Sequence, residues 1–137
     1  MEIMNAIGVA ASGMRAQGER LRVISENIAN ADTTAEAPGA DPYRRKTISF
    51  RNVLDKSMGV NVVRTGDISE DMKSSFRLKF MPDHPMADEN GYIKLPNINT
   101  LTEVMDMREA QRSYEANLGM IEIARGMMGR TLDLLRG

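Results

Sequence analysis

The single histidine, His84, lies in a run rich in carboxylates, which makes this the most obvious place in the sequence to look for metal chemistry. Asp83, Asp88 and Glu89 stand close to it along the chain. Imidazole and carboxylate groups bind metals, but the spacing lacks the alternating oxygen ligands of a calcium-binding EF-hand loop. A solvated loop explains the run better, so we expect no metal site here.

Other arrangements that carry chemistry are incomplete. The chain has no Cys, which excludes thiolate nucleophiles and cysteine-based metal sites. With one His and no GxSxG motif, a catalytic triad has few available parts. Gly119, Gly126 and Gly129 do not follow a predicted strand, so no phosphate-binding loop is indicated. We therefore expect no catalytic residue, no cofactor-binding residue and no metal ligand, and an enzyme centred on His84 is the least favoured hypothesis.

Charge and hydropathy argue against nucleic-acid and membrane partners. The net charge is −1, and the densest basic run, Arg44-Arg45-Lys46, is too short for a nucleic-acid tract; we expect it to be a solvated strand end. No stretch of 18 or more apolar residues is present, so no membrane-spanning segment is predicted. Residues 3–14 resemble the apolar part of a signal peptide, but the helical pattern continues beyond them. We expect a mature helix and no cleaved signal.

Both ends of the chain carry a helical pattern that the middle lacks. Apolar residues recur there at alternating steps of three and four, which places one residue per turn on a single helix stripe. A stripe kept near a period of 3.5 is typical of a coiled-coil seam. The seam residues are the predicted assembly interface: Ile3, Ile7, Met14, Leu21, Ile24, Ile28, Leu118, Ile121, Met128, Leu132 and Leu135.

The N-terminal helix contains three glycines, Gly8, Gly13 and Gly18. Each costs roughly 1 kcal/mol relative to Ala in a helix interior, so the helix is marginal by itself. Two interpretations follow: a frayed terminal helix, or a helix that is ordered only inside a close-packed assembly. Glycine and alanine also allow neighbouring helices to approach closely, which fits the second interpretation.

Turn residues and short β patterns fill the middle of the chain. Residues 32–42 are rich in Pro, Gly, Asp and Thr and predict a linker. The alternation in 76–80 places Phe76, Leu78 and Phe80 on one sheet face, where they could contribute to a small β core. Asn90-Gly91 predicts a tight turn before the next strand.

These patterns together predict a mainly α fold with a small β middle, in which long terminal helices pair as a coiled-coil-like layer and short strands and loops lie between them. Thr100 or Thr102 could cap the second helix, and Thr100 with Glu103 has the spacing of a capping box. Residues 1–31 and 101–137 are expected to form one discontinuous helical domain. Residues 32–42 are the expected linker, and residues 43–100 are the expected β-rich middle segment.

Three sequence motifs resemble those of the bacterial flagellar rod and hook proteins. They are SGMRAQGERLRVISENIANADTT at 12–34, YRRK at 43–46 and EAQRSYEANLGM at 109–120, in the order that the family shows. Residues 83–99 and the short middle resemble the proximal rod members more than the longer distal rod and hook members. The residues that match the family motifs are Ser12, Gly13, Met14, Gln17, Asn27, Asn30, Tyr43, Arg112, Ser113, Tyr114, Ala116 and Asn117.

The resemblance implies an axial structural protein of the flagellum without enzymatic activity. It implies export of the unfolded chain through the flagellar type III apparatus, and self-association in a helical tube that crosses the periplasm within the basal body. Expected neighbours are the other rod proteins FlgB, FlgF and FlgG and the adaptor FliE. A small helical adaptor or binding module, or another rod protein of the same family, is the alternative.

Asn30 stands just before the predicted helix breaker and is expected to set the exit angle of the chain. An Asn can do so by adopting left-handed backbone or by hydrogen bonding to nearby backbone groups. The sequence leaves both alternatives open.

Overall fold

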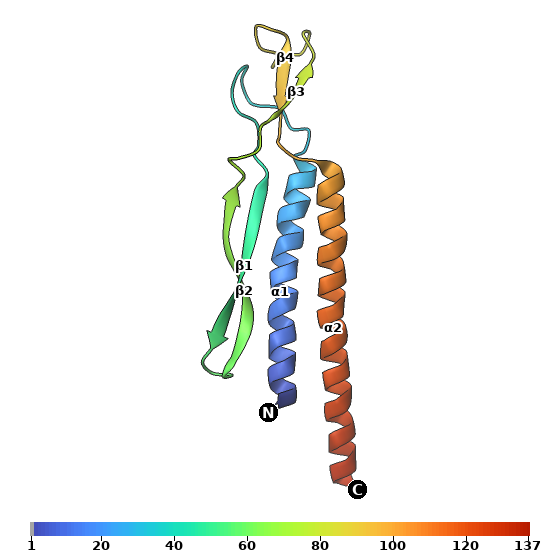
Figure 1. The fold of residues 1–137 in the computed structure, drawn as a ribbon. Coiled ribbons are helices and arrows are strands. Elements are labelled where there is room, and N and C mark those ends of the chain that lie inside the picture. Colours follow the sequence, from blue (N-terminus) through green and yellow to red (C-terminus); the bar gives the residue numbers. More distant parts are fainter. Residues whose placement is uncertain (1) are drawn as a thin grey trace. The chain divides into compact units, whose positions relative to one another are not determined.

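The computed structural model describes residues 2–137 and contains two long helices with four strands between them (Figure 1). This confirms the predicted mainly α fold with a small β middle. Met1, the first residue of the predicted N-terminal helix, lies outside the described residues. The elements in chain order are α1 (Glu2–Ala29), β1 (Lys46–Asp55), β2 (Val60–Glu70), β3 (Arg77–Phe80), β4 (Tyr92–Leu95) and α2 (Thr100–Arg136).

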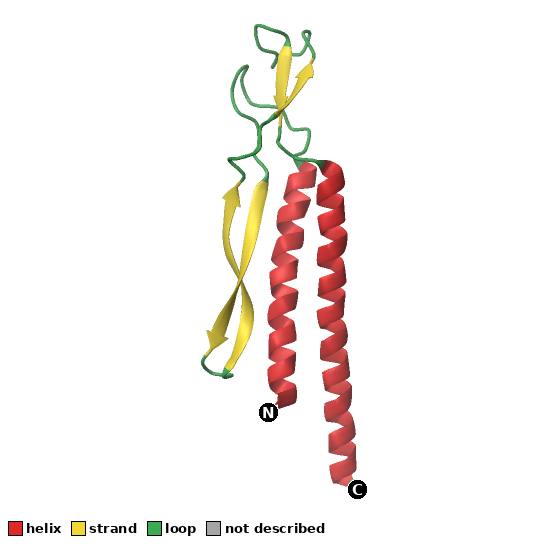
Figure 2. Cartoon of the chain, in the orientation of Figure 1, coloured by secondary structure: helices red, strands yellow, loops and turns green. Residues whose placement is uncertain are grey.

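The four strands form two separate two-stranded sheets, β1 with β2 and β3 with β4 (Figure 2). Residues 32–42, the predicted linker, contain neither helix nor strand. Within residues 2–137, neither helix is both long enough and apolar enough to cross a membrane.

The chain divides into two compact units, each of which contains part of both helices. The first unit comprises Met1–Leu21, Ser49–Asp67 and Arg108–Gly137, and the second comprises Arg22–Ile48 and Ile68–Met107. The sequence did not predict a boundary that cuts through both helices.

Small side chains form the core of the first unit. Ala10, Ala16, Ala110 and Ala124 are buried there, together with Val62 of β2. Because these side chains are short, the helices and the β1–β2 hairpin can approach one another closely. The first unit therefore depends on close backbone packing rather than on large aliphatic groups.

The β1–β2 hairpin occupies most of the segment 47–75, whose fold the sequence left open. One carboxylate closes its turn: Asp55 Oδ1 accepts hydrogen bonds from Ser57 N at 2.9 Å, Ser57 Oγ at 2.6 Å and Met58 N at 3.2 Å. These bonds, the one from the Ser57 hydroxyl first, lower the pKa of Asp55. Gly59 completes the turn with a φ of 68°, a left-handed conformation that glycine adopts without a Cβ penalty.

In the second unit, β3 and β4 pair antiparallel, with Arg77 opposite Leu95 and Phe80 opposite Tyr92. The predicted turn before β4 is confirmed. Gly91 has a φ of 83°, and its N–H donates to Asp88 O at 3.0 Å. The turn brings the Phe80 and Tyr92 rings into an edge-to-face contact with centroids 5.2 Å apart.

The hydrophobic core of the second unit does not lie where the alternation of 76–80 suggested. Leu78 is 63% exposed and Phe80 is 60% exposed, so the face they share points to solvent. The buried side chains come instead from the next strand and the segment after it, namely Ile93, Leu95 and Ile98. The expectation of a β core built on 76–80 was therefore wrong.

The ends of the helices also differ from the prediction. Asn99, not a threonine, caps α2: its Oδ1 accepts hydrogen bonds from Leu101 N at 3.1 Å and Thr102 N at 3.5 Å. At the end of α1, Asn30 Nδ2 donates to Glu26 O at 2.8 Å. No non-glycine residue among 2–137 has a positive φ, so Asn30 acts by local hydrogen bonding and not by left-handed backbone.

Candidate assembly site

A buried asparagine organises the second unit. Asn27 is 1% exposed, and its side-chain amide pairs with the backbone of Lys46 in both directions. Asn27 Nδ2 donates to Lys46 O and Asn27 Oδ1 accepts from Lys46 N, each at 2.9 Å. The side-chain amide thus reproduces the pairing of a peptide group in a sheet, and it fixes the first residue of β1 beside this part of α1.

Tyr43 joins the same network. Its hydroxyl donates to Asn27 Oδ1 at 2.9 Å, so one amide oxygen accepts from two donors. Burial raises the pKa of Tyr43, and the charges of Glu26 and Glu103 add to the effect. Two motif residues that the sequence placed 16 positions apart are therefore in direct contact.

A buried ion pair lies beside Asn27. The Glu103 side chain is only 1% exposed, and its Oε1 accepts a hydrogen bond from Arg45 Nε. Arg45 Nη2 also lies 3.6 Å from Asp106 Oδ2, and Asn27 Nδ2 lies 3.4 Å from Glu103 Oε2. A buried carboxylate is tolerated only when it is paired and hydrogen-bonded. Glu103 therefore ties the first turn of α2 to the chain segment before β1, and it is not half of a capping box.

The basic run 44–46 is engaged in contacts and is not a solvated strand end, contrary to the prediction. Lys46 Nζ lies 3.2 Å from Glu26 Oε2, and the hydrogen bond it donates is the main cause of the lowered pKa of Glu26. The Arg44 guanidinium carbon lies 4.3 Å from the centre of the Phe76 ring. Each basic side chain of the run therefore has a partner within the second unit.

A second asparagine, Asn97, connects the loops of this unit. It is buried, and its Oδ1 accepts from Arg45 N at 2.7 Å. Its Nδ2 donates to Asp71 O at 3.0 Å and Ser74 O at 3.3 Å. Sequence reasoning missed Asn97 and gave Arg45 and Glu103 other roles, although a polar Asn between Pro96 and Ile98 was an available signal.

In the first unit, motif residues of α1 hold the hairpin and α2 close. Ser12 Oγ donates to Val9 O at 2.6 Å and accepts from Val63 N of β2 at 3.1 Å. A Cβ added at Gly13 would lie 2.8 Å from Asn117 Nδ2 of α2, and one added at Gly8 would collide with Met58. The Met58 and Asn117 side chains therefore pack directly against these two glycines, whereas nothing lies within 4 Å of the Cβ position at Gly18.

The predicted interface residues of α1 are mostly covered within the chain, and those of α2 are mostly open. Ile24 is buried. The half-buried members of the set are Ile3, Ile7, Met14, Leu21, Ile28, Ile121 and Met128. The exposed members, with exposed fractions of 40%, 54% and 80%, are Leu118, Leu132 and Leu135.

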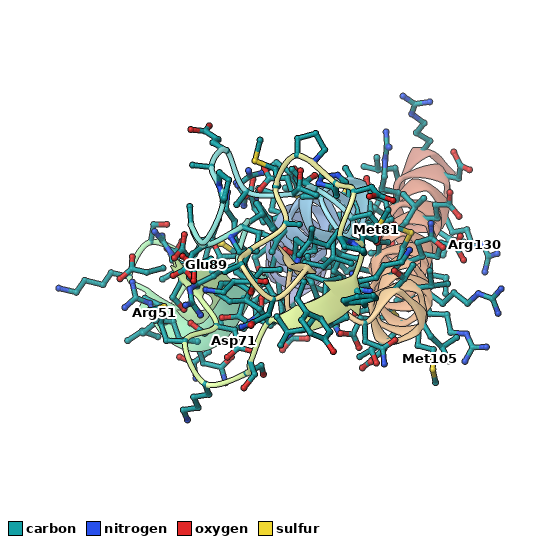
Figure 3. The ribbon with its side chains drawn as sticks, turned by 90° about the horizontal axis from the view of Figure 1, so that it is seen from above. Arg51, Asp71, Met81, Glu89, Met105 and Arg130 are labelled. Carbon is teal, nitrogen blue, oxygen red and sulfur yellow. The ribbon has the colours of Figure 1, made fainter. Side chains whose placement is uncertain are left out.

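More apolar side chains of α2 are exposed than the predicted seam contains. Ile123 is 60% exposed, Met127 49% and Leu134 83%. The labelled Arg130 extends away from α2 in Figure 3. Contacts within the first unit explain this surface: Arg20 pairs with Glu109 and Gly13 meets Asn117, so the two helices run antiparallel there and residue 2 comes opposite about residue 128. No residue of α1 among those described lies opposite the last two turns of α2.

The remaining family-motif residues of α2 differ in their exposure. Arg112 and Ala116 are exposed, and Ser113 and Tyr114 are half-buried. The Oε1 atom of Gln17 is buried without a hydrogen-bond partner in the part of the chain that the structure describes.

The structure brings no metal ligands together around His84. Its Nδ1 accepts a hydrogen bond from Met86 N at 3.0 Å, which occupies one ring nitrogen in a local turn. Among residues 2–137, no group of three or more His, Asp or Glu side chains is close enough to hold a metal ion.

Comparison with known proteins identifies the family. The model described as "Flagella basal body rod protein" matches residues 7–35, and that described as "Flagellar basal body rod FlgEFG protein C-terminal" matches residues 89–134. The flagellar basal-body rod protein FlgC of Agrobacterium fabrum is 48% identical over 128 residues, 93% of this chain and 91% of that protein. The chain belongs to the FlgC family of flagellar basal-body rod proteins. The FlgC proteins of Borreliella burgdorferi, 37% identical over all of both chains, and Salmonella typhimurium, 34% identical over 98% of both, agree.

Membership of the FlgC family confirms the predicted function, a structural subunit of the flagellar basal-body rod. Neither matching family model describes a catalytic family. The matched regions contain some of the residues described above: Ser12, Gly13 and Asn27 lie in the first, and Asn97, Glu103 and Asn117 in the second. Their partners Tyr43, Arg45 and Lys46 lie outside both regions.

Proposed function

We propose that this FlgC-family chain polymerises through its terminal helices, residues 1–31 and 101–137, into a helical tube that forms the proximal part of the rod. The observation that carries the proposal is the exposed apolar surface on the C-terminal half of α2, where Leu132 is 54% exposed and Leu135 80%. Contiguous exposed apolar side chains mark surfaces that another protein covers.

The network around Asn27 fits the same function. It fixes the direction in which the chain leaves α1, through hydrogen bonds to Lys46 and Tyr43. In a repeating assembly, an angular error in one subunit recurs in every subunit, so a rigid exit from the helix favours assembly. We therefore propose that this network positions the parts of each subunit and that α2 supplies the contact.

The proposed neighbours are copies of this chain, the rod proteins FlgB, FlgF and FlgG, and the adaptor FliE, in the periplasmic part of the basal body. The proposed route to that place is the flagellar type III export apparatus. These assignments extend the family membership and the resemblance of the motifs; contacts with each neighbour can be tested by cross-linking in purified basal bodies.

The central test replaces an exposed leucine with a charge. Leu132→Asp should cost little folding stability, within about 0.5 kcal/mol for an exposed position. It should nevertheless abolish incorporation, because burying an unpaired carboxylate in a subunit contact is strongly unfavourable. The measurement is the amount of the chain in purified basal bodies relative to the amount exported.

Thr131→Asp is the matched control, since it adds the same charge at the adjacent exposed residue of α2. We expect this variant to be incorporated better than Leu132→Asp. Normal incorporation of Leu132→Asp would refute the assignment of this surface to subunit packing.

A further inference from the structure

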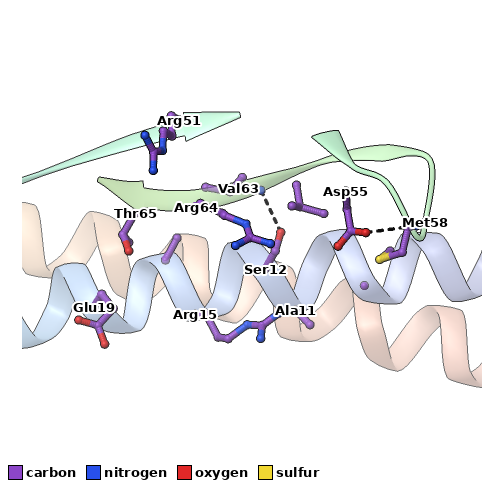
Figure 4. A pocket seen from close by; sticks show the side chains of 13 residues that line it. Ala11, Ser12, Arg15, Glu19, Arg51, Asp55, Met58, Val63, Arg64 and Thr65 are labelled. Atoms are coloured by element: carbon purple, nitrogen blue, oxygen red, sulfur yellow. Dashed lines mark hydrogen bonds between the residues drawn. The ribbon is translucent and has the colours of Figure 1, made fainter. Parts of the chain in front are cut away.

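A groove of about 650 Å³ lies between α1 and the β1–β2 hairpin in the first unit (Figure 4). Small residues of α1 line it, including Gly8, Ala11, Ser12 and Ala16. Its walls also carry three arginines, one from α1 and two from the hairpin: Arg15, Arg51 and Arg64.

Arg15, Arg51 and Arg64 form no ion pair and no hydrogen bond with any other of residues 2–137. Two carboxylates, Glu19 and Asp55, also line the groove. Arg64 acts on Asp55 through its charge, but the Asp55 carboxylate already accepts three hydrogen bonds in the hairpin turn. With three arginines and two carboxylates in its lining, the groove carries a net positive charge.

The pairing of β1 with β2 brings two of the positive charges of the groove close together. Ser49 of β1 lies against Gly66 of β2, and counting two residues from each toward the turn of the hairpin brings Arg51 near Arg64. Like charges at directly opposite positions destabilise a strand pair. Two arginines that repel each other beside a third, Arg15, form a surface that an anionic partner would stabilise.

A surface of the required charge is present on α2. Six residues recur at steps of four, three, four, three and four, so they form one stripe along the helix. Half are acidic and half are glycine, and the acidic ones are exposed and form no ion pair or hydrogen bond with other described residues. The stripe consists of Glu115, Gly119, Glu122, Gly126, Gly129 and Asp133.

The shape of the stripe suits insertion into a groove. Nothing lies within 4 Å of a Cβ position at Gly119, Gly126 or Gly129, so the helix backbone is open to a neighbour along this line. The exposed apolar residues Leu118 and Ile123 flank it. From Glu115 to Gly126 the stripe covers eleven residue steps, about 16 Å, the same length as the groove floor from Gly8 to Glu19.

We propose that the acidic glycine stripe of α2 in one copy docks into the arginine groove of another copy. The arginines of the groove would then face Glu115 and Glu122, while the glycines of α2 meet the small residues of α1. The two surfaces are different patches of the same chain, so the contact is heterologous and extends into a helical array when it does not close. This inference rests on the proposed function and assigns one of its subunit contacts.

Cross-linking tests which molecules meet. The chain has no Cys, so an introduced thiol is the only one that each copy of this chain carries. Arg64→Cys and Glu122→Cys chains, produced together, should give a disulfide-linked dimer in oxidised, purified basal bodies. The control pairs Glu122→Cys with Phe50→Cys, because Phe50 is an exposed hairpin residue that does not line the groove. A dimer with Phe50→Cys equal to that with Arg64→Cys, no dimer from two incorporated chains, or cross-linking of Arg64→Cys to a different rod subunit would each overturn the proposal.

Charge exchange provides the second measurement. Arg51→Glu with Arg64→Glu should reduce incorporation at least about tenfold, as expected from a like-charge contact that costs about 1.4 kcal/mol. Glu115→Arg with Glu122→Arg should do the same, and the chain carrying all four changes should recover most of the loss. If the chain with all four changes is incorporated no better than the charge-reversed chains, while the parent chain is incorporated normally, the contact between the stripe and the groove is refuted but the proposed function is not. Absence of the parent chain from basal bodies would instead overturn the proposed function.

Discussion

Removal of Arg45 should be among the most damaging single substitutions in the chain. The Glu103 side chain is 1% exposed, and Arg45 is its only cationic partner among the described residues. Arg45→Met keeps much of the length of the side chain but leaves the carboxylate buried without a counter-charge. Asn27 Nδ2, at 3.4 Å, supplies only a weak remaining hydrogen bond to Glu103.

The expected loss is about 3 kcal/mol, the lower end of the range for breaking a buried ion pair, because Arg45 is itself 27% exposed. This is a large fraction of the 5–15 kcal/mol or so that stabilises a typical domain. With a urea dependence of about 1–3 kcal/mol per M, the unfolding midpoint should fall by at least about 1 M.

The assay is urea unfolding of the purified chain, followed by helical circular dichroism. Lys94→Met is the matched control, because it removes a solvent-exposed ion pair with Asp41 and should cost only about 0.2–1 kcal/mol. Adding Glu103→Leu to Arg45→Met should restore much of the lost stability, since it removes the unpaired buried charge. A loss below about 0.5 kcal/mol for Arg45→Met, or a double variant no more stable than the single, would refute this reasoning.

Two further predictions concern motif residues. Burial raises the pKa of Tyr43 above its usual 10.0, and only the neutral phenol can donate to Asn27, so its contribution to stability is complete below pH 10 and is lost as the pH rises through the raised value. Tyr43→Phe should therefore flatten the fall in unfolding free energy measured above pH 10, and an unchanged slope would contradict this assignment. Gly18→Ala should stabilise α1 by up to about 1 kcal/mol in thermal melts, because the added methyl group meets open space. Gly13→Ala should give no such gain, because Asn117 lies 2.8 Å from the new Cβ; equal gains would show that this contact does not constrain the helix.

The sequence by itself determined the helices, the turn at Asn90-Gly91 and the family. Helical periodicity is a local property of the chain, and it placed α1 and α2 to within a few residues of their observed ends. The Asn90-Gly91 turn was equally readable, because a left-handed position selects glycine whatever surrounds it. The flagellar motifs could be recognised because they combine specific residues in a fixed order. The comparisons with known proteins confirmed the family that these motifs indicated.

Only the tertiary structure decided which polar residues hold the fold together. Glu103 had the spacing of a capping residue and Arg45 belonged to an ordinary basic run, yet they form a buried pair across 58 residues of chain. The energy of such a pair depends on burial and on the distance between its partners, and neither can be read from local sequence. The same holds for Gly13 and Gly18, which are alike in sequence but differ because only the first faces Asn117. Periodicity determines which residues share a helix face. The elements that pack against that face depend on the fold of the whole chain, and their contacts determine the role of each side chain.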